Sequence, residues 1–212
     1  MTTTSDDAEP KGMWLGTTKD ERRQSRRTGL LEAALEIVGA EGSAAVTVRS
    51  VCRQSSLTAR YFYENFANRE ELLAELYRQL AAEAQITLTE SLRNSGGEPA
   101  AQARATVEAF VSFALDDPRK GRMLLVEPLR DPELSALTIL TTPTFTKLAM
   151  GHLPPGTTRT KQALIATSLA GSLGIVFAAW LSGNIKASRE ELVDHCTELL
   201  LVAGLGSRVL TD

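Results

Sequence analysis

Arginine, tyrosine and threonine side chains are concentrated between residues 47 and 69, in the segment TVRSVCRQSSLTARYFYENFANR. These groups hydrogen-bond to phosphate oxygens and to the edges of bases. Arg60 can contact a guanine through two hydrogen bonds, and Ala59 and the methyl group of Thr58 can meet the methyl group of a thymine. The segment therefore predicts recognition of nucleic acid.

Other polar residues flank these candidates for base contact. Tyr61 is expected to be exposed near the start of the same helix. We expect Thr47, Tyr63 and Arg69 to hold phosphates on either side of a groove, which positions a protein without reading sequence. Four arginines further upstream can add contacts to the DNA backbone or the minor groove: Arg22, Arg23, Arg26 and Arg27.

Short helices separated by a tight turn must position these side chains. Thr47 can cap a short helix, residues 55–57 form the turn, and Thr58 can cap a second short helix over 59–65. Asn68 can cap a longer helix that runs to about residue 92. This is the layout of a helix-turn-helix, in which the second helix enters the major groove.

The distribution of charge agrees with a DNA-binding surface in this region. The chain has 212 residues and a formal net charge of −3, but residues 21–69 carry eight Arg against five Glu, a net +3. It is the only basic segment, as a surface that faces phosphates requires. Two distant cysteines and the lack of a signal-peptide pattern indicate a reducing, cytoplasmic setting.

No recognisable pattern of catalytic, metal-binding or cofactor-binding residues occurs in the sequence. There is no G-x-S-x-G, P-loop or Rossmann glycine pattern, and the two histidines lack the spacing of a di-iron site. Asp116, Asp117 and Asp131 are better explained as helix caps. We therefore expect a chain that is not an enzyme and that needs neither a metal nor a cofactor.

The remainder of the chain shows helical periodicity and no strand pattern, which predicts an all-α protein. Helices are expected over about 21–38, 100–116, 117–127, 131–150 with a kink or break at Pro143, 159–182 and 188–205. We predict a disordered tail over 1–20, a helix-turn-helix domain over 21–68 with three helices, and a C-terminal helical ligand-binding and dimerisation bundle over 69–212.

The span from about Arg27 to Leu76 resembles the N-terminal domain of the tetracycline-repressor (TetR) family of bacterial regulators. The resemblance rests on LLEAALEIVGAEG, TVRSVC and SLTARYFYENFANREELL, in which Tyr63 and Phe66 occupy characteristic positions of the family. Three features depart from the family pattern: Glu64 and Asn65 replace an aromatic residue and His, Arg69 replaces Lys, and Ser55-Ser56 replaces Ala-Gly. These departures affect operator prediction rather than the expected fold.

The resemblance implies a C-terminal domain that binds a small molecule and dimerises through its last two long helices. Small side chains at helical spacing, followed by an apolar seam, favour such an interface, with an intramolecular core as the alternative. The candidate interface residues are Ala163, Thr167, Ala170, Gly174, Ala178, Leu192, Cys196, Leu199 and Ala203. Residues 162–185 carry no charge, which a membrane span would also explain, but their many small and polar residues favour a buried helix.

A pocket for a largely apolar ligand is expected between the helices of residues 100–182. Its candidate lining residues are Phe110, Phe113, Met123, Leu124, Phe145, Phe177 and Trp180, with Thr141, Thr142 and Thr144 as polar groups. The sequence thus predicts a homodimeric repressor that binds a palindromic DNA operator and is released by a small-molecule effector. The alternative is a helical ligand-binding or scaffold protein whose helix-turn-helix does not read DNA.

Overall fold

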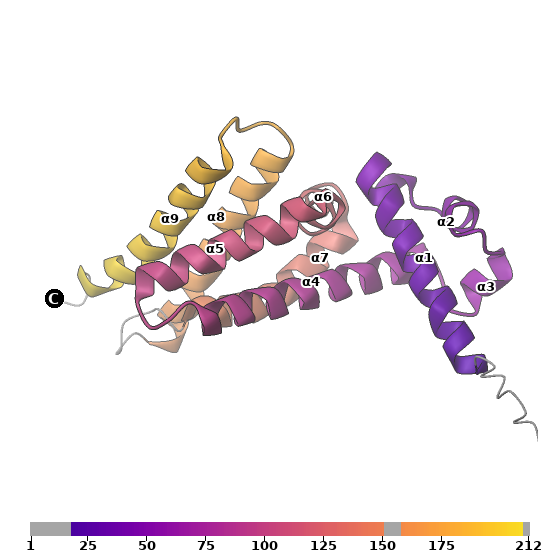
Figure 1. The fold of residues 1–212 in the computed structure, drawn as a ribbon, viewed down its shortest axis with the longest axis horizontal. Helices are drawn as coiled ribbons and strands as arrows, with labels where there is room; N and C mark the ends of the chain where they lie inside the picture. The colour runs from indigo at the N-terminus through magenta and orange to yellow at the C-terminus, as the bar shows by residue number, and fades with distance from the viewer. Residues whose placement is uncertain (1–17, 151–157, 210–212) are drawn as a thin grey trace, which may run out of the picture.

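The computed structural model describes the backbone of residues 18–150 and 158–209, and the side chains of residues 18–142 and 158–202. All regular elements within these ranges are helical, so the predicted all-α class is confirmed (Figure 1). The predicted tail over 1–20 falls mostly outside the described residues. In chain order the elements are α1 (Lys19–Glu41), η1 (Ser43–Ala45), α2 (Val48–Ser55), α3 (Ala59–Tyr63), α4 (Arg69–Asn94), α5 (Pro99–Asp116), α6 (Pro118–Gly121), η2 (Arg122–Val126), η3 (Glu127–Leu129), α7 (Pro132–Met150), α8 (Arg159–Leu181) and α9 (Arg189–Val209).

Side-chain caps begin the helices of the N-terminal part. Thr47 accepts a hydrogen bond from the backbone N–H of Ser50 in a capping box, and Asn68 accepts one from the backbone N–H of Glu71. Both predicted caps are therefore confirmed. Thr58 occupies the cap position of α3, but its side chain makes no capping hydrogen bond.

One hydrophobic cluster joins the helix-turn-helix to the rest of the molecule. Leu30, Val38 and Phe62 are fully buried in this cluster, together with Leu72 of α4 and Met123 of η2. The apolar stripe of α1 packs against α2 and α4, so the short helices α2 and α3 derive their stability from this core rather than from their own propensity.

The C-terminal helices form a bundle with the long helix α4 along one side. Helix α5 packs on α4 and α9, and α7 packs on α4 and α8. A second cluster, built on Val107, Val111, Phe177, Leu192 and Cys196, holds α5, α8 and α9 together. In Figure 1 this pair, α8 and α9, lies at the opposite end of the molecule from α2 and α3.

Two expected helices differ in form from the structure. The segment after Asp117 is α6, a π-helical turn (η2) and a 3-10 turn (η3) rather than one helix. Gly121 permits its close packing, because a Cβ there would lie 2.8 Å from the carbonyl oxygen of Ala114. Pro143 does not end α7, which continues to Met150. Proline has no backbone N–H, so Pro143 leaves the carbonyl oxygen of Ile139 without its helical hydrogen bond. Ile139 is 71% exposed, so solvent can reach this part of the helix.

Candidate nucleic-acid interface

The N-terminal end of α3 is open to solvent. Thr58, Ala59 and Arg60 are exposed, and the side chain of Arg60 retains 84% of its accessible surface. Its guanidinium pairs with Glu64 at 3.0 Å, one helical turn later. An exposed pair of this kind contributes about 0.3–0.5 kcal/mol, so Arg60 can leave Glu64 for a base edge at little cost.

The two tyrosines of α3 differ in how firmly they are held. Tyr63 is 61% exposed and meets the buried ring of Phe62 edge-on at 5.5 Å. Tyr61 is 37% exposed, and the guanidinium of Arg26 lies over its ring at 4.6 Å. Both tyrosine rings are thus exposed on the same short helix as Arg60.

Thr47 lies exposed at the start of α2, and its side chain caps that helix. Its hydroxyl accepts from the backbone N–H of Ser50 and hydrogen-bonds to the Ser50 hydroxyl, both at 3.0 Å. A phosphate at this position would meet the N-terminal end of α2, which favours negative charge.

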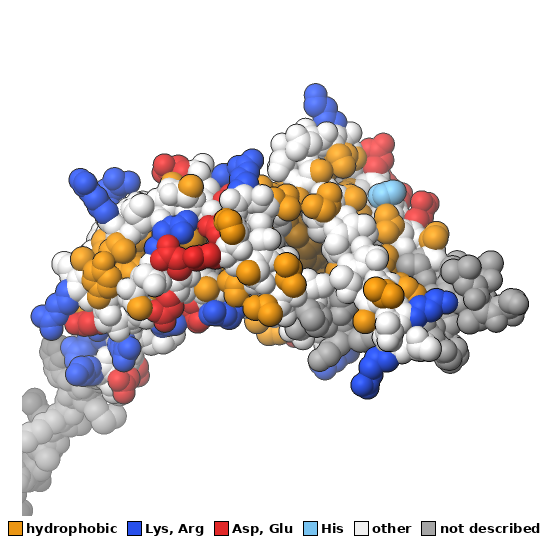
Figure 2. Space-filling view, turned by 180° about the vertical axis from the view of Figure 1, so that it is seen from behind, with side chains coloured by type: hydrophobic (Ala, Val, Ile, Leu, Met, Phe, Trp, Pro, Cys, Tyr) orange, Lys and Arg blue, Asp and Glu red, His pale blue; other side chains and the backbone are white. Residues whose placement is uncertain are grey.

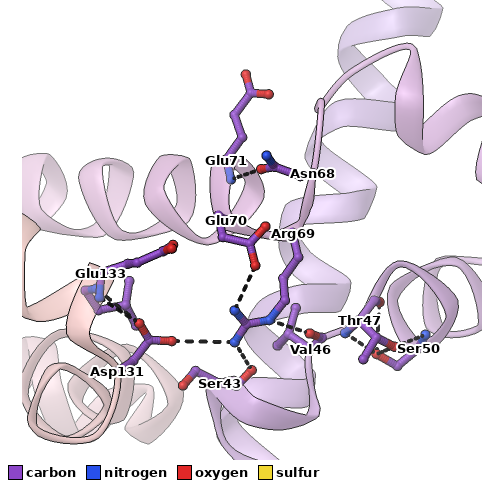
Figure 3. A network of polar contacts seen from close by, with 11 residues as sticks. Ser43, Val46, Thr47, Ser50, Asn68, Arg69, Glu70, Glu71, Asp131 and Glu133 are labelled. Carbon is purple, nitrogen blue, oxygen red and sulfur yellow. Dashed lines mark hydrogen bonds and ion pairs between the residues drawn. The ribbon is translucent and has the colours of Figure 1, made fainter.

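Arg69 contacts several groups of the protein. Its guanidinium donates to the carbonyl oxygens of Val46 at 2.7 Å and Ser43 at 2.8 Å, and pairs with Asp131 at 3.5 Å and Glu70 at 3.3 Å (Figure 3). Through these contacts Arg69 joins the loop before α2 to the start of α7. Its predicted contact with phosphate stays a prediction.

A second polar contact reinforces this junction. Glu127, only 2% exposed, accepts from the backbone N–H of Ser43 at 2.7 Å and from Arg122 at 2.9 Å. Burial raises the pKa of Glu127, but the hydrogen bonds from Ser43 and Arg122 outweigh it and hold the pKa below its ordinary value. A charged cleft of about 420 Å³ opens beside Arg69, Arg122 and Glu127.

Two arginines of the basic segment received no predicted role from the sequence: Arg49 and Arg53. Both are exposed on α2, and neither side chain forms a hydrogen bond or ion pair with the described residues. Their spacing of four residues, which places them on one face of α2, could have marked them as a candidate contact surface. The arginines of α1 divide differently: Arg23 and Arg27 donate to backbone carbonyls of the residues that follow α3.

The predicted interface residues of α8 and α9 do not form one outward face. Ala163 and Thr167 are exposed and Ala170, Gly174 and Leu199 are half-buried, whereas the others with described side chains are buried: Ala178, Leu192 and Cys196. Leu192 and Cys196 pack within the same chain in the cluster that contains Val107 and Val111 of α5, as in the intramolecular alternative. The side chain of Ala203 lies outside the described residues.

A neighbouring stripe of α8 faces solvent instead. Leu164 and Ile175 are 65% and 55% exposed, with exposed Ser168 and Gly171 between them at helical spacing. Helix α8 is also the one described helix long and apolar enough to cross a membrane, with a mean hydropathy of 1.9 and 22% of its apolar window buried. Much of its apolar surface is therefore left uncovered by the chain itself.

The candidate pocket residues are divided between two hydrophobic clusters. Phe113, Met123 and Leu124 belong to the cluster shared with α1 and α4, while Phe177 belongs to the cluster of α5 and α9. Phe110 contacts both clusters, and its ring lies 5.0 Å from that of Phe177 and 6.4 Å from that of Phe113.

The remaining pocket predictions have separate outcomes. The indole N–H of Trp180 donates to the carbonyl of Ala187 at 2.8 Å, which fixes the turn between α8 and α9. The side chains of Phe145 and Thr144 lie outside the described residues. Thr141 and Thr142 are half-buried and donate to backbone carbonyls of their own helix. Figure 2 shows hydrophobic side chains gathered around a hollow on the face opposite to the view of Figure 1.

A capped helix-turn-helix joined to a helical bundle defines a class of transcriptional regulators with separate DNA-binding and C-terminal parts. Residues 30–76 match the family model described as bacterial regulatory proteins, tetR family. The N-terminal part of the chain is therefore similar to this family of regulators. The comparison with curated proteins gave no match.

Solved structures extend the likeness of the fold over most of the chain. The fatty acid degradation regulator FadR from Bacillus halodurans is similar, with a TM-score of 0.69, 17% identity, and coverage of 83% of this chain and 94% of that one. FadR from Bacillus subtilis in complex with stearoyl-CoA has a TM-score of 0.67 and 15% identity, with coverage of 84% of this chain and 98% of that one. A putative TetR-family regulator from a Rhodococcus species has a TM-score of 0.65 and 17% identity, with coverage of 85% of this chain and 99% of that one.

Proposed function

We propose that the chain is a sequence-specific, DNA-binding transcriptional repressor of the cytoplasm, which binds a palindromic operator as a homodimer and is released by a small, largely apolar ligand. The observation that carries the proposal is the exposed start of α3, where Arg60 stands free of the core beside Tyr61 and Tyr63. We keep 21–68 as the DNA-binding unit and 69–212 as the sensing unit. An arginine on a recognition helix commonly reads guanine, which contributes about 1–3 kcal/mol of discrimination.

The exposed face of α8 supports the homodimer. Leu164 and Ile175 flank Gly171, and a Cβ at Gly171 or Gly174 would meet no atom within 4 Å. Contacts within the chain therefore do not require these two glycines. Small residues on an apolar helix face allow the close approach of a second helix, and a two-fold dimer matches the symmetry of a palindrome.

The apolar side chains packed between α5 and α8, with Phe110 and Phe177 in edge-to-face contact, support an apolar rather than a charged ligand. FadR from Bacillus subtilis binds stearoyl-CoA in a similar fold. Long-chain acyl-CoA is therefore the first probe that we would add to a preformed complex with DNA. In the mechanism that we propose, ligand binding favours a dimer geometry in which the two copies of α3 no longer match their half-sites.

Selection of the purified chain against a random duplex library tests this function. The expected winner is a palindrome that binds far more tightly than a scrambled duplex in fluorescence anisotropy at two salt concentrations. Arg60→Ala should reduce discrimination by about 10-fold or more, whereas Arg93→Ala, an exposed arginine at the end of α4, should change it little. Failure to enrich any sequence, or unchanged discrimination in Arg60→Ala, would contradict the proposal.

A further inference from the structure

Three arginines of α1 contact the recognition helix and the residues that follow it. Arg23 donates to the carbonyl oxygen of Glu64 at 3.0 Å, and Arg27 donates to that of Asn65 at 2.8 Å. Arg26 lies over the ring of Tyr61 at 4.6 Å. Positions 23, 26 and 27 share one face of α1. We refer to these three residues as the arginine clamp.

Helix α3 needs support from outside, because it is short. It spans only Ala59–Tyr63, and its cap residue Thr58 makes no side-chain hydrogen bond to it. A helix of this length is unstable by itself. The carbonyls that follow a helix carry partial negative charge, so the guanidinium groups of Arg23 and Arg27 stabilise this end through charge-assisted hydrogen bonds.

The clamp also ties α3 to α4. The guanidinium of Arg27 lies over the ring of Phe66 at 4.3 Å and pairs with Glu75 of α4 at 3.4 Å. Planar guanidinium groups suit such combined stacking and hydrogen bonding better than ammonium groups do. The end of α3 is therefore fixed against two long helices, while its start remains open for bases.

Two buried polar atoms at this contact have no partner within the described part of the chain: Nε of Arg26 and Oδ1 of Asn65. Both residues border Tyr61, since the amide nitrogen of Asn65 donates to the carbonyl oxygen of Tyr61 at 2.7 Å. An unpaired buried polar atom costs about 1–3 kcal/mol. The contact thus orients Tyr61 at the expense of its own hydrogen bonding, which points to a role beyond stability.

We propose that Arg23, Arg26 and Arg27 are positioning residues for DNA recognition, which set the angle of α3 and the orientation of Tyr61. This inference rests on the proposed function. It replaces the expectation that the arginines at 23 and 27 hold the DNA backbone, because their guanidinium groups are engaged with the protein. Loss of the clamp then lowers discrimination between operator and other DNA, rather than merely removing positive charge.

Arg22 supplies a matched control. It is an exposed arginine of the same helix, and its side chain makes no hydrogen bond or ion pair with the described residues. Arg22→Ala therefore removes the same charge without touching α3. Its affinity for operator and for scrambled duplex should fall by similar factors, because the lost term is independent of sequence.

Hydrogen exchange of the free protein, followed by mass spectrometry, tests the hold on α3 without DNA. Amides of residues 59–66 should exchange about fivefold or more faster in Arg23→Ala and Arg26→Ala than in Arg22→Ala. Arg23→Lys retains a donor and should restore slow exchange. The exposed Arg23 can be replaced without opening the core, which keeps this test valid if Arg26→Ala fails to fold. Unchanged exchange in Arg23→Ala would overturn the clamp.

Anisotropy on the selected operator and a scrambled duplex then tests discrimination. The ratio of the two dissociation constants should fall about fivefold in Arg23→Ala and Arg26→Ala, remain as in the parent chain in Arg22→Ala, and recover in Arg23→Lys. A ratio that does not change while α3 exchanges faster would overturn the positioning role. If the parent chain binds operator and scrambled duplex equally well, the proposed function fails. The hydrogen-exchange data then still decide whether the arginine clamp holds α3.

Discussion

The carboxylate of Glu127 accepts a hydrogen bond from the backbone N–H of Ser43 at 2.7 Å, across 84 residues of chain. Ser43 opens the turn that leads into α2, and Glu127 lies at the start of η3 in the C-terminal part. Arg69 holds the same turn through the carbonyl of Ser43 and reaches Asp131 at the start of α7 (Figure 3). The DNA-binding helices and the bundle are therefore joined by charged hydrogen bonds as well as by the core.

Glu127→Gln should lower the free energy of unfolding by about 1–3 kcal/mol, because it weakens two charge-assisted hydrogen bonds at a buried position. Glu41→Gln is the matched control, since Glu41 lines the same cleft but is exposed. It should change stability by less than about 0.5 kcal/mol. Urea titrations followed by circular dichroism measure both variants. Equal stabilities of the two variants would contradict this role of Glu127.

The contribution of Glu127 should also depend on pH. Its pKa lies below the ordinary value, because the hydrogen bonds from Ser43 and Arg122 outweigh the effect of burial. Its stabilisation is thus complete above the ordinary glutamate pKa of about 4.3 and is lost as pH falls through the lowered pKa. The difference in stability between the parent chain and Glu127→Gln should remain constant near neutral pH and shrink as the pH falls through the lowered pKa of Glu127. A difference that grows in acid would reverse the assigned sign.

Arg69→Ala should separate a structural role from a contact with phosphate. Because Arg69 is engaged by Val46, Ser43 and Asp131, the variant should lose about 1–3 kcal/mol of stability. The slope of log affinity against log salt should stay unchanged, whereas a lost phosphate contact would lower it by about 0.9. Arg49→Ala, at an exposed position of α2, provides the control that keeps stability within about 0.5 kcal/mol.

Local signals predicted most of the helical elements. Thr47, Asn68 and Ser188 all accept hydrogen bonds at the helix starts that their sequence context indicates. A helix cap depends on residues within four positions of one another, so it can be predicted from a single sequence. The exposed face of α3 was predictable for the same reason, because the buried Phe62 fixes which residues point outward.

Contacts between distant parts of the chain could not be predicted from the sequence. Periodicity places Leu192 and Cys196 on one face of α9, but it cannot show that α5 of the same chain covers that face. The contact of Arg69 with Asp131 could not be foreseen either, because the two residues lie 62 positions apart. The arginine clamp could not be predicted, because Arg23 and Arg27 donate to the backbone carbonyls of Glu64 and Asn65, and every residue carries such a carbonyl whatever its side chain.

Ser56 adopts a left-handed conformation, with φ of 56°, at the end of α2. It is the one non-glycine residue with positive φ in the described ranges, at the position where the resemblance leads one to expect glycine. Ser56→Gly should therefore raise stability by about 1 kcal/mol. Ser55→Gly, one residue earlier inside α2, should lower it by about as much. The midpoints of thermal unfolding of the two variants should shift in opposite directions. A destabilising effect of Ser56→Gly would contradict backbone strain at Ser56.

The two cysteines should react at different rates. Burial raises the pKa of both thiols, that of Cys196 to about 11. Cys196 is fully buried, whereas Cys52 is half-buried. A disulfide reagent should therefore modify Cys52 first and Cys196 only after unfolding. Because Cys196 packs within one chain, dilution should not expose it. If dilution alone made Cys196 reactive, its burial would depend on a second copy.

The solvent-facing stripe of α8 gives the sharpest test of the homodimer. Gly171→Leu should leave the fold of a single chain intact, because a Cβ at Gly171 meets no atom within 4 Å. The larger side chain should nevertheless separate two closely packed helices, and Ile175→Glu should place a charge in the same interface. Both variants should sediment as monomers at concentrations where the parent chain is a dimer, and both should lose tight operator binding.

Ile86→Glu is the control for these variants, since Ile86 is 59% exposed on α4 and lies outside the α8 stripe. It should remain a dimer with unchanged helicity. Dimeric Gly171→Leu and Ile175→Glu would exclude this stripe of α8 as the contact surface. In that case the exposed apolar face of α8 would need another occupant, and the palindromic operator would need a different arrangement of the two recognition helices.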